Sequence, residues 1–182
     1  IWSPKVQKYV ATQTTYENRP KPIPDNLGNA VRRVLAMRTS PDGVHWIPSD
    51  PVGSSVRTLF RLGEEWLIRP DEYDPPDMEF YHMNPFPYGD RFAAFVLNYA
   101  PSPAPVNPVT ALRDHGPFLS AEWWLSDDGI SWRRPYRGQD ILGDATTTAP
   151  HAPLVLDDGM YFVIGGGLYK VGLGRLAGVY SK

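Results

Sequence analysis

Short apolar runs bounded by turn-forming residues dominate the hydrophobic pattern of this chain. The runs Ala93–Leu97 and Met160–Ile164 are flanked by Gly, Pro, Asn and Asp residues, which is typical of β-strands joined by tight turns. Asn29–Arg38 is the one segment whose local propensity favours a helix, because its apolar residues can share one helical face. An internal repeat favours a strand for this segment instead.

The repeat is the motif Ser-x-Asp-Gly-x-x-Trp, which occurs at Ser40–Trp46 and again at Ser126–Trp132. Asp-Gly provides the positive φ of a hairpin turn, the Ser and Asp side chains can bond the turn amides, and Trp can pack under the next strand. We expect both copies to close hairpins and to have an architectural role. Because the aromatic-rich run Ala121–Leu125 precedes the second copy, the segment before the first copy is predicted to be a strand too.

A second unit alternates with the first and consists of a strand, a Gly-containing turn and a strand. It occurs at Thr58–Ile68, Met83–Leu97 and Pro153–Ile164. Pairing each unit with an Asp-Gly hairpin gives four-stranded units of roughly 40 to 50 residues, the size of a propeller blade. The sequence therefore predicts an all-β fold of antiparallel, propeller-type blades, about three of them within this chain. Ala100–Gly116 is predicted to be an irregular insertion.

The chain is expected to consist of two parts. Residues 1–28 contain four prolines and a polar run, which predict an extended N-terminal arm with little regular structure. Residues 29–182 are predicted to form the partial propeller domain, whose C-terminal end leads out of the propeller.

Composition supports a folded β-rich chain. The 182 residues include 16 Gly and 20 Pro, which is too many for a helical bundle, and 13% aromatic residues, six of them Trp, which can fill a core. The absence of cysteine excludes both a disulfide framework and thiol catalysis.

Charge and motif searches exclude several classes of function. The 18 basic and 20 acidic residues give a net charge of −2 without basic clusters, which argues against nucleic acid as the main partner. The longest apolar runs are far shorter than the roughly 20 residues of a membrane-spanning helix. The sequence does not begin with a charged-then-apolar leader, so we expect a targeting segment to be absent, already removed, or outside the given sequence. No phosphate-binding glycine motif is present, and His82 and His115 have no second ligand at zinc-site spacing. No metal or cofactor is expected.

The sequence resembles the five-bladed β-propeller glycoside hydrolases, the superfamily of invertases, arabinanases and β-xylosidases. The resemblance rests on the Asp-Gly turns and on the runs Asp77–Met83 and Phe86–Phe92. The resemblance covers about residues 34–170. It implies cleavage of a poly- or oligosaccharide by paired carboxylates, and an extracellular or periplasmic location. A complete propeller of this type needs roughly 250 to 300 residues, so two blades and a third carboxylate are missing. A companion chain or self-association is therefore expected.

The candidate catalytic residues lie in the acidic segment Asp71–Glu79, which has five carboxylates in nine residues. Crowded carboxylates can keep one group protonated as a general acid, or accept hydrogen bonds from a hydroxyl-rich ligand; a solvated acidic loop is the alternative. Strand alternation predicts that Asp77, Glu79 and Tyr81 share one face. By the resemblance, Glu79 is the general acid and Asp77 stabilises or tunes it.

Further residues are predicted to bind substrate through carboxylates, aromatic rings or a histidine: Asp74, Tyr81, Trp66, Glu122, Trp123 and His151. Glu122 could equally lie on a solvated strand face, and His151 could be a loop residue without a role. Two classes of function stay open at this point. One is a glycoside hydrolase, or a fragment or subunit of one, and the other is a non-catalytic carbohydrate-binding or structural propeller module.

Overall fold

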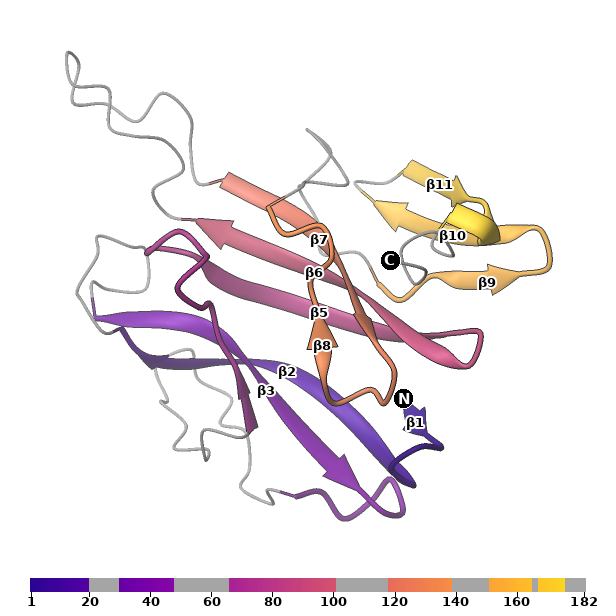
Figure 1. Ribbon diagram of the computed structural model, residues 1–182, viewed down its shortest axis with the longest axis horizontal. Coiled ribbons are helices and arrows are strands. Elements are labelled where there is room, and N and C mark those ends of the chain that lie inside the picture. Colours follow the sequence, from indigo (N-terminus) through magenta and orange to yellow (C-terminus); the bar gives the residue numbers. More distant parts are fainter. Residues whose placement is uncertain (20–29, 48–65, 101–117, 139–150, 165–166, 176–182) are drawn as a thin grey trace.

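A computed structural model of the chain shows an all-β fold with three antiparallel sheets (Figure 1). The structure describes residues 1–19, 30–47, 66–100, 118–138, 151–164 and 167–175. In these ranges the only helical element with assigned bounds is a short 3-10 helix, Leu173–Arg175. The predicted fold class, all-β with antiparallel blade-like sheets, is confirmed.

Each sheet is a meander in which neighbouring strands follow one another in the sequence. The first sheet has the strands β1 (Trp2–Ser3), β2 (Lys8–Asn18), β3 (Val31–Ser40) and β4 (Leu67–Ile68). The second sheet has β5 (Glu79–Tyr88), β6 (Arg91–Ala100), β7 (Phe118–Ser126) and β8 (Trp132–Arg133). The third sheet has β9 (Leu154–Leu156), β10 (Gly159–Ile164) and β11 (Gly167–Val171).

The segment for which helix propensity and repeat disagreed is a strand. β3 pairs with β2 from Tyr9–Ser40 to Asn18–Val31, and its residues from Arg32 to Met37 are buried. The repeat therefore predicted this segment correctly and helix propensity did not, because burial against neighbouring elements determines the structure of a short apolar segment.

The expectation of little regular structure in the first 28 residues is wrong for the part that the structure describes. β2 is an 11-residue strand in the interior of the first sheet. Its Thr12 and Thr14 hydroxyls donate hydrogen bonds to the carbonyls of Met83 and Tyr81 on β5. These threonines belong to the polar run that suggested an extended arm, and they bond the edge strand of the second sheet. The first sheet thus joins residues on both sides of the expected boundary near residue 28.

Both Asp-Gly turns have the predicted geometry. Gly43 and Gly129 each have φ of 77°, and the amides of both donate 2.8 Å hydrogen bonds to the Ser40 and Ser126 hydroxyls. In the second copy the Asp128 carboxylate accepts hydrogen bonds from the amides of Ile130 and Ser131, at 2.8 and 2.7 Å. The prediction that both copies close hairpins is confirmed.

The second sheet lies between the other two and is buried on both faces (Figure 1). On β6, Ala94 and Val96 pack with Leu35 of β3, whereas Phe95 and Leu97 pack with Phe162 of β10. Strand alternation therefore sends successive β6 side chains into two different cores. This face-to-face stacking of antiparallel sheets is the packing expected of neighbouring blades.

The two ends of the sheets differ in their connections. At one end, which we call the hairpin end, lie the turns containing Gly43, Gly89 and Gly129. At the other, which we call the loop end, β2 and β6 end while β3, β5 and β7 begin. Functional residues concentrate on loops held by rigid elements. The described loop 71–78 lies at this end, directly before β5, so we look for a site here.

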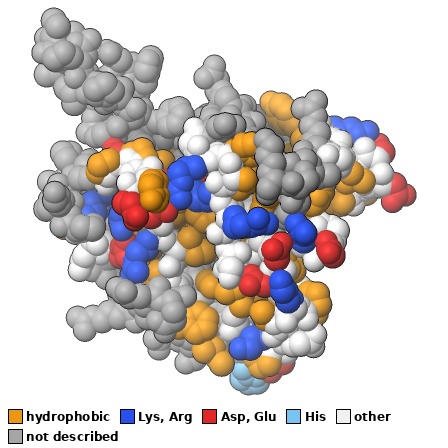
Figure 2. Space-filling model, viewed as in Figure 1, with side chains coloured by type: hydrophobic (Ala, Val, Ile, Leu, Met, Phe, Trp, Pro, Cys, Tyr) orange, Lys and Arg blue, Asp and Glu red, His pale blue; other side chains and the backbone are white. Residues whose placement is uncertain are grey.

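On the face of the molecule shown in Figure 2, acidic and basic side chains lie next to one another. This mixture agrees with the near-neutral net charge of the sequence. No described helix of the chain has the length and apolar composition needed to span a membrane.

Candidate functional site at the loop end of the sheets

Glu79, the first residue of β5, lies at the loop end in a buried ion-pair cluster. Its side chain is fully buried, and its carboxylate forms ion pairs with Arg19 and with Arg33, the latter at 2.8 Å. The backbone amide of Arg33 adds a hydrogen bond of 3.1 Å. Two guanidinium groups and an amide favour the ionised carboxylate. The surroundings of Glu79 therefore favour a role as a fixed negative charge over that of a proton donor.

Tyr81 lies on a β-bulge next to this cluster. The pairing of β5 with β6 shifts register between Phe80 and His82, so Tyr81 has no partner in the ladder. The Arg33 guanidinium lies 4.8 Å from the centre of the Tyr81 ring and 5.3 Å from that of Tyr99. Bulges redirect side chains and are frequent next to active sites. Arg33 thus contacts both Glu79 and Tyr81.

Asp77 lies two residues before β5 and is 7% exposed. Among the buried neighbours of this segment is Asn98, which pairs with Phe80 across the ladder. Asn98 is 1% exposed, and neither polar atom of its amide has a hydrogen-bond partner within the part of the chain that the structure describes. Buried polar groups are almost always paired, so the Asn98 amide has unused capacity for a water or a ligand hydroxyl.

Two histidines also lie near the loop end. Burial, together with the positive charges of Arg33 and His151, lowers the pKa of His82 below its ordinary value. His151, which is exposed, lies three residues before β9 and is close enough for its charge to act on His82. The structure therefore brings His151 toward the start of β5. A neutral imidazole, which this pKa favours, can both donate to and accept from a sugar hydroxyl.

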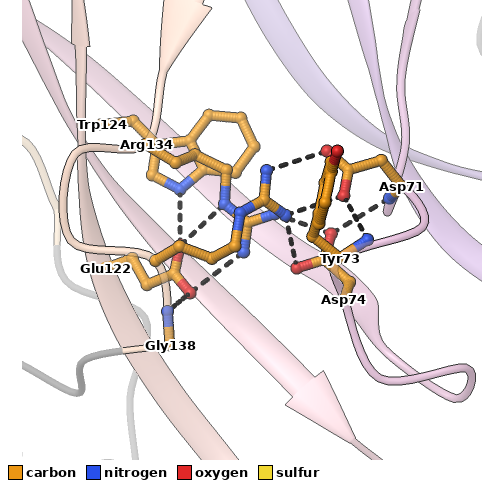
Figure 3. A network of polar contacts seen from close by, with 8 residues as sticks. Asp71, Tyr73, Asp74, Glu122, Trp124, Arg134 and Gly138 are labelled. Atoms are coloured by element: carbon orange, nitrogen blue, oxygen red, sulfur yellow. Dashed lines mark hydrogen bonds and ion pairs between the residues drawn. The ribbon is translucent and has the colours of Figure 1, made fainter.

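Asp74 and Glu122 belong to a second buried cluster, which we call the arginine network (Figure 3). Arg134 bonds Asp74 at 2.6 Å and Glu122 at 2.9 and 3.0 Å, and its guanidinium lies over the rings of Phe80 and Trp124. Burial alone would lower the pKa of Arg134, but the hydrogen bonds with the two carboxylates raise it.

The remaining members of the arginine network complete its hydrogen bonding. Arg137 bonds both carboxylate oxygens of Asp71 and one of Asp74. The Gly138 amide and the Trp124 indole donate to Glu122. Asp74 and Glu122 were predicted to bind substrate, but their carboxylates are engaged within the protein. Their geometry supports a role in holding the segment before β5 in place.

The two tryptophans among the candidates lie elsewhere. The Trp123 ring packs edge-on against Phe86, Phe95 and Phe162, in the core between the second and third sheets. Trp66 is half-buried, directly before β4 at the outer edge of the first sheet.

The hairpin end has a pocket of about 350 Å³. Its lining combines two cations, two carboxylates, a proline and a phenylalanine: Pro4, Lys5, Asp90, Arg91, Phe92 and Asp127. It contains none of the predicted site residues. Within the described ranges, no group of three or more His, Asp or Glu side chains could hold a metal ion.

Sequence reasoning missed the arginines that surround the candidate carboxylates. Arg19, Arg33 and Arg134 lie 60, 46 and 12 residues from their carboxylate partners, so no local spacing connects them. One signal was available, because Arg32 and Arg33 directly precede the apolar run of β3 and lie in its buried stretch. A charged residue in a buried strand requires a partner of opposite charge.

Comparison with known proteins adds no further assignment. No family model, no curated protein and no solved structure matches the chain. The function is therefore inferred from the residues and their geometry.

Proposed function

We propose that this chain is part of a propeller-type glycoside hydrolase that binds and cleaves a poly- or oligosaccharide at the loop end of its sheets. The observation that carries the proposal is the gathering of Asp77, Glu79, Tyr81 and His151 at this end, where β5 and β9 begin. Carboxylates, an aromatic ring and a histidine are groups that bind sugar hydroxyls, and carboxylates also stabilise an oxocarbenium-like transition state.

The geometry refines the roles within this proposal. A glycoside hydrolase needs one carboxyl group that transfers a proton and one that is ionised. Glu79, paired with Arg19 and Arg33, fits the ionised role, in which it stabilises developing positive charge. The assignment of Glu79 as general acid stays a prediction from the sequence resemblance, and the variants described below distinguish the two roles.

Hydrolysis of soluble polysaccharides tests the proposal directly. The full chain is incubated with xylan, arabinan and inulin, and the release of reducing ends is measured. Wild type should release reducing ends from at least one of them, and Asp77→Asn should lose at least tenfold in rate while its circular dichroism spectrum is unchanged. Release by Asp77→Asn at the wild-type rate would remove Asp77 from the mechanism.

The pH profile of a Glu79→Gln variant separates the two roles of Glu79. If Glu79 is the proton donor, its removal should abolish the alkaline limb of the rate profile, which reports the loss of the acid's proton. If Glu79 acts through its charge, the rate should fall at every pH while the shape of the profile is retained. Because Gln leaves two buried arginines without their carboxylate, stability is measured in parallel.

A non-catalytic carbohydrate-binding or structural module is the second candidate. It is favoured by the burial of Asp74, Glu79 and Glu122 in ion pairs, because a carboxylate used for structure is not available for chemistry. Binding of xylohexaose, arabinohexaose or an inulin-type fructan without release of reducing ends would support this candidate over the hydrolase. Neither binding nor cleavage would contradict both carbohydrate functions.

The proposal includes a companion sheet. The second sheet is covered on both faces, whereas the third sheet exposes Leu154, Val163 and Leu168 at 61%, 59% and 69%. Exposed apolar side chains that gather on one sheet mark an interaction surface, and we propose that another sheet, from a companion chain or a second copy, covers them. Light scattering should show a particle larger than the 20.4 kDa chain. Because the proposed polysaccharide substrates are found outside the cell, we further propose an extracellular or periplasmic location.

A further inference from the structure

The loop that precedes β5, residues 71–78, presents an exposed aromatic ring next to the candidate site. Tyr73 is 75% exposed, the highest exposed fraction among the large hydrophobic side chains of the described residues. The Arg137 guanidinium lies over its ring, 5.8 Å from the ring centre. The exposed surface of the Tyr73 ring is therefore accessible to a ligand.

The loop around Tyr73 is held in one conformation by its own hydrogen bonds. The Tyr73 amide donates to the Asp71 carboxylate at 3.0 Å, and the Asp71 amide donates to the Asp74 carboxylate at 3.1 Å. The Asp74 amide bonds the Asp71 carbonyl, and the Met78 amide bonds the Pro75 carbonyl. Two consecutive prolines further restrict the backbone.

The arginine network fixes this loop to the second sheet. Arg137 bonds Asp71 through two parallel hydrogen bonds of 2.9 and 2.8 Å, and Arg134 ties Asp74 to Glu122 of β7. Arg134 also lies over Phe80, the residue that follows Glu79. The same network therefore sets the position of the exposed ring and the start of β5.

We infer that Tyr73 is a substrate-binding residue, on whose ring a sugar unit of the glycan stacks through its C–H face. This inference rests on the proposed function and extends it to a residue outside the predicted site. A ring that is already fixed loses little conformational entropy when a ligand binds, which is the advantage of preorganisation. The loop and its two arginines are then the support that holds this platform beside the carboxylates.

Three variants test the platform. Tyr73→Ala should weaken binding of the oligosaccharide about tenfold, which corresponds to about 1.4 kcal/mol, because the apolar face of the ring is lost. Tyr73→Phe keeps the ring and should bind within about threefold of wild type. Tyr9→Ala is the matched control, since Tyr9 is another exposed tyrosine, 38% exposed, but lies at the hairpin end; it should bind as wild type does.

Binding is measured by titration calorimetry on the full chain with xylohexaose, arabinohexaose and an inulin-type fructan. The melting temperature of Tyr73→Ala should stay close to that of wild type, because the ring is exposed, so a loss of affinity cannot come from unfolding. If wild type binds one of the three and Tyr73→Ala binds it equally well, the platform is refuted while the proposed function stands. If wild type binds none of them, the proposed function fails, and the platform fails with it.

Discussion

Replacement of Arg134 by methionine should destabilise the folded chain strongly. Arg134 is the only cation that bonds both Asp74 and Glu122 among the described contacts, and its side chain is 7% exposed. Methionine retains part of the apolar stem over Phe80 and Trp124 but removes the charge. Two carboxylates, each 1% exposed, would then lose their shared guanidinium partner.

The loss in the free energy of unfolding depends on the hydrogen bonds that the two carboxylates retain in Arg134→Met. Removing one partner of a buried ion pair costs about 3 to 5 kcal/mol. Glu122 retains hydrogen bonds from Trp124 and Gly138, and Asp74 retains Arg137, so we expect the lower limit, about 3 kcal/mol. For a chain of this size, about 2 to 4 °C per kcal/mol converts this to a fall in melting temperature of about 6 to 12 °C.

Urea denaturation monitored by tryptophan fluorescence measures this loss. Arg133→Met is the matched control, because the Arg133 side chain is 53% exposed and lies 3.6 Å from Asp127; it should cost less than about 0.5 kcal/mol. The double variant Arg134→Met with Glu122→Gln should lose less stability than the sum of the two single variants, because the second change removes the carboxylate charge that Arg134→Met leaves uncompensated. If Arg134→Met costs no more than Arg133→Met, the arginine network does not stabilise this chain as described.

Three further predictions concern single positions. Hydrogen bonds with His45 and Val44 lower the pKa of Asp42, and the Asp42 carboxylate raises the pKa of His45. The stabilisation by Asp42 is complete above its unfolded pKa of 3.8 and is lost as the pH falls through its folded pKa. The stabilisation by His45 is complete below its unfolded pKa of 6.5 and is lost as the pH rises through its folded pKa. His45→Ser, which reproduces the second copy of the motif, should therefore lower the urea midpoint at about pH 5 but not at about pH 9; equal effects at both would contradict the pairing. Gly129→Val should cost about 1 to 3 kcal/mol, because of the positive φ, whereas Gly172→Val, in open space without positive φ, should be close to neutral in thermal melting. Asn98→Leu should raise the melting temperature, because it removes an unpaired buried amide; a fall would show that the amide is satisfied by bound water.

The local part of the fold could be predicted from the sequence, because its causes lie within a few residues. The Ser-x-Asp-Gly-x-x-Trp motif contains both the donors and the acceptors of its turn, so even the hydrogen bonds around Gly43 and Gly129 followed from the pattern. The strand β3 followed from the repeat. These inferences needed no knowledge of distant contacts.

The parts that sequence reasoning missed depend on distant partners. The segment of β2 was predicted to have little regular structure because of its polar run and the prolines around it. Instead, the hydroxyls of Thr12 and Thr14 bond carbonyls of β5 that lie 71 and 67 residues away. Likewise, the acidic segment predicted Asp77 and Glu79 as site residues but not the arginines that neutralise Glu79. The burial and ion pairing of a carboxylate depend on how the sheets pack, and the spacing of residues along the sequence does not reveal this packing.

Hydrogen exchange of the full chain, with and without the oligosaccharide that binds best, tests the central claim most directly. A glycan site at the loop end predicts slower exchange of backbone amides in residues 71–82 and 151–156 on binding, with no change in the turns around Gly89 and Gly129 at the hairpin end. Slower exchange confined to the hairpin end, around the pocket that Arg91 and Asp127 line, would contradict the assignment of the site to the loop end.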